Sequence, residues 1–218
     1  IFITVLICSW DKNNDKKETV EEEKIQIGMS FDSFVIERWL RDRAVFVSTA
    51  KELGAEVNVQ NANGDVEEQK KHIDYFIEKE VDAIVIVCVD SYGLREQVEK
   101  ASAAGIKIIA YDRLITEADV DLYISFDNSM VGSMMGEAFV QNGVTDTNVL
   151  MLGGSPTDSN VPLVEDAFKK VMEENNNTIL DSFHADNWEA ELAAQYVYDN
   201  VDVVAQADAI MCGNDNVA

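Results

Sequence analysis

Residues that build metal or redox centres are scarce in this chain of 218 residues. It has two histidines, and its three cysteines, Cys8, Cys88 and Cys212, are widely separated. Because no HExxH pattern and no closely spaced cysteine pair occurs, the sequence predicts neither a metal site nor another cofactor. Cys88 and Cys212 lie in apolar strand patterns, where we expect small buried thiols.

Basic residues are also few, since 17 lysines and arginines stand against 41 acidic residues, a formal net charge of −24. A surface this acidic repels phosphate backbones, so nucleic-acid binding is a poor candidate function. The hydrophobic content of 47% supports packed cores and excludes global disorder. The length suffices for one large domain or for two lobes of roughly 100 residues each.

One uninterrupted apolar run stands at the start of the chain, IFITVLI over residues 1–7, followed by Cys8. It resembles the end of a secretory signal with a lipid-modified cysteine, although Ile7 stands where such signals carry a small residue. An uncleaved membrane anchor explains the run equally well, and a buried strand is a third interpretation. The charged stretch Asp11 to Lys24 lacks apolar periodicity, is typical of a tether and argues against the strand.

This arrangement predicts a globular part outside the cytoplasmic membrane, either anchored to its outer face through the N-terminus or periplasmic. The chain opens on Ile1 rather than methionine and stops at Ala218 just after a predicted strand. We therefore expect it to be a piece of a longer protein, with C-terminal elements missing.

From Lys24 onward, short apolar strands alternate with amphipathic helices. The predicted strands are Lys24–Ser30, Glu56–Gln60, Ala83–Val89, Ile106–Ala110, Leu122–Phe126, Asn148–Leu152, Thr178–Phe183 and Ala209–Cys212. The predicted helices are Val35–Leu53, Val66–Lys79, Leu94–Ala104, Ser129–Asn142, Val161–Glu174 and Trp188–Asn200. Repeated βαβ units favour an α/β fold with parallel sheets. Since the rhythm restarts after Leu122–Phe126, we expect two doubly wound lobes, residues 24–127 and 128–218, after an anchor and tether over residues 1–23.

Ligands of open parallel sheets bind beyond the carboxyl ends of the strands. The loops after the predicted strands carry eight candidate ligand-binding residues: Arg38, Trp39, Asp112, Arg113, Asp158, Asn160, Trp188 and Asn214. Carboxylates, amides and guanidiniums pair with vicinal hydroxyl groups, and an indole packs against the apolar face of a pyranose. The set holds no positioned histidine or cysteine nucleophile, so we expect a sugar-binding protein rather than an enzyme.

Each candidate also has an ordinary structural interpretation. Arg38 suits a surface charge of a helix, Trp39 suits packing between helix and sheet, and Trp188 suits an anchor at the start of a helix. The pair Asp112-Arg113 suits a local ion pair, and Asp158 or Asn160 suits a helix cap. Their shared position at strand ends is the observation that favours a binding site.

Five segments together resemble the xylose-binding proteins of sugar ABC transporters, which have the periplasmic binding protein type I fold. The matching stretches are IGMSFDSFVIERWLRDR, QNANGDVEEQ, GIKIIAYDRLITEADVDLYISFDN, GGSPTDSN and GNDN. The similarity runs from about Lys24 to the last residue, and the stretch from Tyr111 to Asn128 is its most specific part. The aspartate-arginine pair also occurs in ribose-type relatives.

The resemblance implies that hydrogen bonds to sugar hydroxyls come from Arg38, Asp112, Arg113, Asp158, Asn160 and Asn214. It also implies that Trp188 and Trp39 enclose the ring from opposite sides. This sequence departs from the pattern near Glu165, where relatives tend to carry a basic residue. The implied partners are a monosaccharide, D-xylose first, and either an ABC permease or the extracellular domain of a sensor histidine kinase.

Two further function classes compete with sugar binding. The ligand core of a repressor shares this fold, but residues 1–23 offer no helix-turn-helix and the surface is acidic. An enzyme such as a sugar isomerase or glycosidase needs an acid and a base, for which Asp158 and Asp186 are the available pair.

Overall fold

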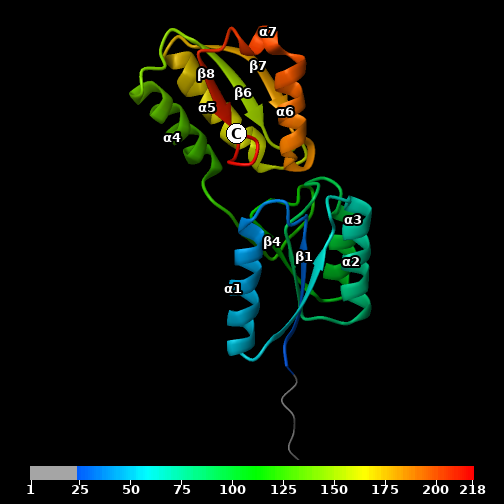
Figure 1. The fold of residues 1–218 in the computed structure, drawn as a ribbon. Helices are drawn as coiled ribbons and strands as arrows, with labels where there is room; N and C mark the ends of the chain where they lie inside the picture. The colour runs from blue at the N-terminus through cyan, green and yellow to red at the C-terminus, as the bar shows by residue number, and fades with distance from the viewer. Residues whose placement is uncertain (1–23) are drawn as a thin grey trace, which may run out of the picture.

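The computed structural model describes residues 24–218. Residues 1–23, with Cys8 and the expected anchor, lie outside the described residues. The chain forms a five-stranded sheet in the order β2-β1-β3-β4-β5 and a three-stranded sheet in the order β7-β6-β8. Figure 1 shows the two sheets in separate lobes, flanked by helices on both faces and joined by the segment that leads into α4. The predicted fold class, parallel-sheet α/β with two lobes, is confirmed.

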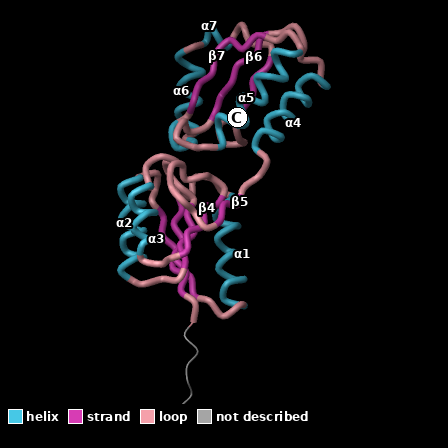
Figure 2. Tube along the Cα trace, turned by 180° about the vertical axis from the view of Figure 1, so that it is seen from behind, coloured by secondary structure: helices cyan, strands magenta, loops and turns pink. Residues whose placement is uncertain are grey.

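The first lobe alternates strands and helices with the predicted rhythm. Its strands are β1 (Gln26–Phe31), β2 (Glu56–Asn61), β3 (Ala83–Ile86), β4 (Lys107–Tyr111) and β5 (Leu122–Ile124). Its helices are α1 (Arg38–Glu52), α2 (Val66–Glu78) and α3 (Arg95–Ala103). All strand pairs are parallel, and α1 covers one face of the sheet while α2 and α3 cover the other (Figures 1 and 2). The carboxyl ends of the strands therefore lie at one edge of the lobe, facing the second lobe.

Two apolar clusters hold this lobe together. The face under α2 and α3 buries Phe76, Ile84 and Ile108 completely. The face under α1 buries Phe31 and Trp39. Because β3 is covered on both faces, its sequence is a continuous apolar run rather than an alternating one.

The second lobe repeats the pattern with β6 (Asn148–Gly153) at its centre, between β7 (Thr178–His184) and β8 (Ala209–Cys212). Its helices are α4 (Asn128–Gln141), α5 (Asn160–Glu174), α6 (Ala190–Asp199) and α7 (Val201–Val204), with a 3-10 turn, η1, at Asp186–Trp188. Helices α4 and α5 pack so closely that a Cβ atom at Gly132 would lie 2.0 Å from the carbonyl oxygen of Val164. The absence of a side chain at Gly132 allows this approach. The boundary between the lobes at residues 127 and 128 stays a prediction, although β5 pairs within the first sheet and α4 packs on α5.

Several predicted element bounds are wrong by a few residues. Helix α1 starts at Arg38 rather than Val35, so residues 32–37 form a loop at the end of β1. The predicted strand Ala83–Val89 ends at Ile86 as β3, and residues 87–90 continue as a loop. The predicted helix Trp188–Asn200 begins at Ala190, because Asn187 and Trp188 adopt positive φ angles of 51° and 62°. In all three cases the predicted helix or strand included residues that belong to the loop after a strand in the structure.

None of the helices within residues 24–218 is long and apolar enough to cross a membrane.

The thiol of Cys88 is expected to resist alkylation in the native protein. Cys88 is completely buried, and burial raises its pKa to about 12, so little nucleophilic thiolate forms near neutral pH. Treatment with iodoacetamide at pH 8, followed by peptide mass spectrometry, should leave Cys88 unmodified and modify it in urea. The partly exposed Cys212 provides the comparison, since it should react faster than Cys88 in the native state. Equal labelling of Cys88 in native and unfolded protein would contradict the expectation.

Candidate ligand-binding site

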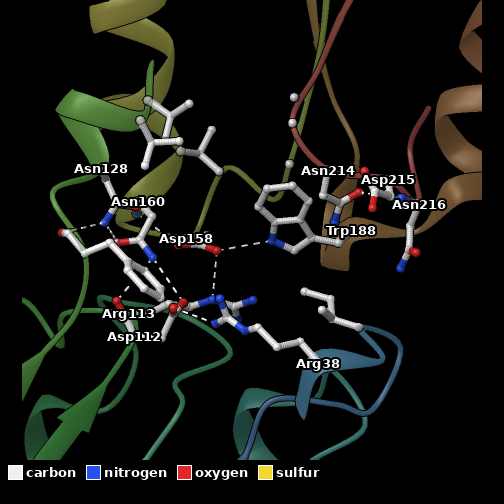
Figure 3. A pocket seen from close by; sticks show the side chains of 18 of the residues that line it. Arg38, Asp112, Arg113, Asn128, Asp158, Asn160, Trp188, Asn214, Asp215 and Asn216 are labelled. Carbon is white, nitrogen blue, oxygen red and sulfur yellow. Dashed lines mark hydrogen bonds and ion pairs between the residues drawn. The ribbon is translucent and has the colours of Figure 1, made fainter. Parts of the chain in front are cut away.

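A cavity of about 650 Å³ lies between the lobes, at the carboxyl ends of the strands of both sheets. All eight sequence-predicted site residues line it: Arg38, Trp39, Asp112, Arg113, Asp158, Asn160, Trp188 and Asn214. Figure 3 shows seven of these side chains, all but Trp39, labelled around the cavity. The structure thus brings together residues that lie up to 176 positions apart in the sequence, as the strand-end argument predicts.

Arg113 is the buried centre of an ion-pair network that joins the two lobes. Its Nη1 atom donates to Asp32 Oδ2 at 2.7 Å and to the carbonyl oxygen of Cys88 at 2.9 Å. Its Nε atom lies 2.7 Å from Asp158 Oδ2, across the interface between the lobes. The side chains of Arg113 and Asp158 are each 3% exposed, so this pair is shielded from solvent.

Burial sets the pKa directions within this network. Desolvation raises the pKa of Asp32, although the neighbouring Arg113 opposes the shift. Desolvation lowers the pKa of Arg113, but the attraction of Asp32 and Asp158 outweighs it, so the net pKa lies above the ordinary value. The guanidinium therefore keeps its charge, and its positive charge is matched by two buried carboxylates.

Asp112 links Arg38 of α1 to Asn160 of α5. Arg38 Nη2 donates to Asp112 Oδ1 at 2.6 Å, and Asn160 Nδ2 donates to Asp112 Oδ2 at 3.2 Å. Asn128 Nδ2 in turn donates to Asn160 Oδ1 at 3.0 Å, which extends the chain of hydrogen bonds to the start of α4 (Figure 3). Asp112 has a positive φ of 67°, a conformation that a non-glycine residue adopts at a cost, and such strain is concentrated at functional sites.

Trp188 lies on a floor formed by two glycines. A Cβ atom at Gly154 would lie 2.1 Å from Trp188 Cζ2, and one at Gly213 would lie 3.1 Å from Cζ3. The indole Nε1 donates to Asp158 Oδ2 at 3.1 Å, which fixes the ring in its plane. The two glycines cover one face of the indole, and Trp188 lines the cavity. The ring therefore offers a flat apolar surface to a ligand.

Asp158 lies one residue before Ser159, the N-cap residue of α5, and its side chain bonds to the start of that helix and makes further contacts as well. Its Oδ1 accepts from the backbone N–H of Asn160 at 2.9 Å, at the start of α5. Its Oδ2 accepts from Trp188 and pairs with Arg113. The hydrogen bond to the start of α5 therefore fixes the direction of the Asp158 carboxylate, which also contacts Trp188 and Arg113 in the lining of the cavity.

Trp39 lines the cavity but is 1% exposed. It packs in the apolar cluster with Phe31, and the Arg38 guanidinium lies 4.1 Å from the centroid of its ring. The predicted role of Trp39 in covering one sugar face stays a prediction. The ordinary interpretation, packing between α1 and the sheet, describes its surroundings in this structure.

Asn214 follows β8 and shapes the last wall of the cavity. Its Oδ1 accepts from the backbone N–H groups of Asn216 and Val217, at 2.9 and 3.0 Å. Because both of those bonds use the oxygen, the two N–H groups of the amide are available as donors.

Sequence reasoning missed several lining residues, among them Phe126, Asn128 and Glu165 as a wall residue. Phe126 is the last residue of the predicted strand Leu122–Phe126 and Asn128 lies two residues beyond it, so the strand-end rule applied to this strand points to both. Glu165 lies in the second turn of α5, inside a helix, and the strand-end rule selects only loops that follow strands. Asp186, the partner that an acid-base mechanism with Asp158 requires, does not line the cavity.

The lobes also meet through Ser91, which is completely buried. Its backbone N–H donates to the carbonyl oxygen of Thr157 at 3.0 Å, and its hydroxyl accepts from the N–H of Ser159 at 3.0 Å. Leu114 N–H donates to the hydroxyl of Ser159 at 2.9 Å. The loop 155–159 is thereby docked on the first lobe, which holds Asp158 beside Arg113.

Chemically, the cavity combines hydrogen-bond donors and acceptors with one flat aromatic wall. Within residues 24–218, no group of three or more histidine, cysteine, aspartate or glutamate side chains is arranged to hold a metal ion. Guanidiniums, amides and carboxylates held by one another present fixed polar groups to a polyhydroxylated ligand.

Comparison with known proteins places this architecture in a family. A model described as "Periplasmic binding protein domain" matches residues 27–218. The D-xylose-binding periplasmic protein of Escherichia coli is 43% identical over 150 residues, 69% of this chain and 45% of that protein. The protein of the same name from Haemophilus influenzae is 35% identical over 205 residues, 92% of this chain and 61% of that protein.

A solved structure with a related sequence agrees in fold. It is an ABC transporter solute binding protein from Clostridium phytofermentans with bound β-D-glucose, with a TM-score of 0.78 and 26% identity. The alignment covers 88% of this chain and 65% of that chain. The chain thus spans between 45% and 61% of the length of the two curated relatives described above. The match over residues 27–218 and the shared two-lobed fold establish that this chain belongs to the periplasmic binding protein family.

Proposed function

We propose that this chain binds a neutral monosaccharide, with D-xylose as the first candidate, in the cavity between its lobes. The observation that supports this most directly is the convergence of eight strand-end residues on one cavity of about 650 Å³, within the size range of small-molecule sites. The names of the two relatives from Escherichia coli and Haemophilus influenzae point to the same sugar.

The wall chemistry fits a pyranose with several hydroxyl groups. Trp188 supplies a flat surface for the apolar C–H face of the ring, and the Asp112, Asp158 and Asn214 side chains supply hydrogen-bonding groups at its edge. Arg38 is 39% exposed at its side chain and covers Trp39, so a small movement of Arg38 opens the second aromatic face to the ligand. With Trp188 on the opposite side, the sugar would then lie between two indoles, the arrangement proposed for this site.

We further propose that the protein binds its ligand without transforming it and works outside the cytoplasmic membrane, held there by the N-terminal segment. Closure of the lobes around a sugar creates a surface that a membrane partner recognises. An ABC permease is the proposed partner, in keeping with the transporter protein from Clostridium phytofermentans. A sensor histidine kinase remains the alternative, and permease or kinase genes beside this one distinguish the two.

Calorimetric titration of the protein with D-xylose, D-ribose, D-glucose and L-arabinose tests the proposal. We expect binding of one sugar per chain, with D-xylose bound at least about tenfold more tightly than the others. The reason is that a wrong epimer leaves a buried polar partner unpaired, at a cost of about 1–3 kcal/mol. The sugar should be recovered unchanged after incubation, since no turnover is proposed. Absence of binding for all four sugars, or formation of a product, would overturn the proposed function.

A further inference from the structure

Among the carboxylates that line the cavity, Glu165 differs from the others in its surroundings. Five carboxylates and three guanidiniums line the cavity. Two of the carboxylates, Asp112 and Asp158, are paired with the lining guanidiniums of Arg38 and Arg113. The remaining three are Glu37, Glu165 and Asp215. Of these, Glu165 is 4% exposed, whereas the other two are exposed to solvent.

The chain makes room for this carboxylate at the end of β6. A Cβ atom at Gly153 would lie 2.1 Å from Glu165 Oε1, so the glycine leaves space for the carboxylate in its present position. His184 Nε2 lies 3.1 Å from both carboxylate oxygens and donates to Oε2, while Oε1 accepts no well-aligned hydrogen bond within residues 24–218. The carboxylate is therefore held in place but incompletely satisfied.

The partners of the Glu165 carboxylate, Lys169 and His184, lie behind it, away from the cavity. Lys169 Nζ lies 3.4 Å from Oε2 of this carboxylate. Neither Lys169 nor His184 lines the cavity, whereas Glu165 does. The cavity thus faces the negative end of this cluster, across a wall from which water is largely excluded.

A buried charge acts on a bound ligand much more strongly than an exposed one, because solvent screens the exposed charge. The exposed Glu37 and Asp215 contribute little for this reason. From this asymmetry we infer that Glu165 sets the charge class of the ligand, favouring neutral sugars and protonated amino sugars and rejecting sugar acids and sugar phosphates. This inference rests on the proposed monosaccharide binding, and it assigns to that site a selectivity by charge.

The test uses pairs of sugars that differ by one charge. D-xylose is compared with 2-amino-2-deoxy-D-xylose, and D-glucose with D-glucosamine, in titrations of the wild type, Glu165→Gln and Asp215→Asn. D-glucuronate serves as the anionic probe. Glu165→Gln keeps the shape of the side chain and an acceptor for His184 but removes the charge. Asp215→Asn removes one charge from an exposed position on the same cavity and is the matched control.

We expect the ratio of amino-sugar to neutral-sugar affinity to fall at least about fivefold in Glu165→Gln, the size expected of one partly compensated buried charge. The neutral sugar should bind Glu165→Gln and wild type within about twofold, and Asp215→Asn should change the ratio by less than about twofold. D-glucuronate should bind Glu165→Gln more tightly than wild type.

An unchanged ratio in Glu165→Gln, or no binding of either amino sugar to the wild type, would overturn the inference while leaving neutral-sugar binding intact. A parallel loss of neutral and amino sugars in Glu165→Gln would also overturn it, because that pattern belongs to a residue that only supports the wall. If no neutral sugar binds the wild type, the proposed function fails, and the inference fails with it.

Discussion

Replacing Arg113 with methionine is expected to lower the free energy of unfolding by about 3–5 kcal/mol, because two buried carboxylates lose their counter-charge. Asp32 and Asp158 both contact this guanidinium at 2.7 Å, and Arg113 itself is 3% exposed. Methionine fills most of the vacated volume, so the loss reports on charge rather than on a cavity. Urea denaturation followed by circular dichroism measures the change.

A surface arginine provides the matched control. Arg95 forms two ion pairs, with Glu99 at 2.9 Å and Glu117 at 3.5 Å, but its side chain is 56% exposed. Arg95→Met should cost much less than Arg113→Met, because solvent-exposed ion pairs contribute little to stability. Equal costs for Arg113→Met and Arg95→Met would show that burial of the Arg113 network does not carry the stability assigned to it.

The pH dependence of the variant separates charge from packing. Desolvation already raises the pKa of Asp32 with Arg113 present, and Arg113 acts in the opposite direction. Without the guanidinium, the folded-state pKa of Asp32 rises further above its unfolded value, so the folded variant binds a proton more readily than the unfolded chain. The variant is therefore expected to regain stability relative to wild type as the pH falls from 7 to 5. A difference that stays constant over this range would point to lost packing instead.

The fold and the position of the site follow from two features that a single sequence displays. Apolar strands alternating with amphipathic helices indicate parallel sheets, and the strand-end rule then selects the loops that meet between the lobes. Arg38, Asp112, Asp158, Trp188 and Asn214 were found in this way. The rule works because the backbone direction of a parallel strand fixes which end of the sheet its following loop occupies.

What the sequence did not reveal depends on side-chain packing. Trp39 follows a strand, as Trp188 does, yet one indole is buried under Arg38 and the other lies on glycines at the cavity wall. Glu165 is reached only through the space that Gly153 leaves beside it. No periodicity or spacing encodes these contacts, because they join segments whose distance is set by how helices and sheets pack.

Glycine is what places an aromatic wall beside the carboxylate of Asp158. The backbone of Trp188 has a positive φ of 62°, unusual for a residue with a large side chain, and the indole ring lies over Gly154 and Gly213. Packing on glycine and the hydrogen bond to Asp158 together hold this strained residue in one orientation. The same contacts make the wall sensitive to a single methyl group.

Removal of the indole in Trp188→Ala is expected to weaken binding of the preferred sugar by about 30- to 150-fold, or about 2–3 kcal/mol. This loss of binding free energy combines two terms: the apolar area that one ring face no longer buries, and the stacking of the sugar on the indole. Trp188→Phe keeps an aromatic face but not the hydrogen bond to Asp158, so it should lose less than about tenfold. Calorimetric titration measures each affinity, and Tyr198→Ala, which removes an exposed aromatic ring of α6, is the control for the lobe as a whole.

Gly154→Ala should reproduce much of the loss of sugar affinity expected for Trp188→Ala, although it leaves the indole itself unchanged. The added Cβ would lie 2.1 Å from Trp188 Cζ2, so the indole ring must move away from Gly154. The substitution removes no polar side chain, so a loss of affinity would report on the position of the ring. If Gly154→Ala and Trp188→Ala both bind the sugar as the wild type does, the indole is not a ligand wall. If only Trp188→Ala weakens binding, the ring stacks on the sugar but does not depend on the glycine floor for its position.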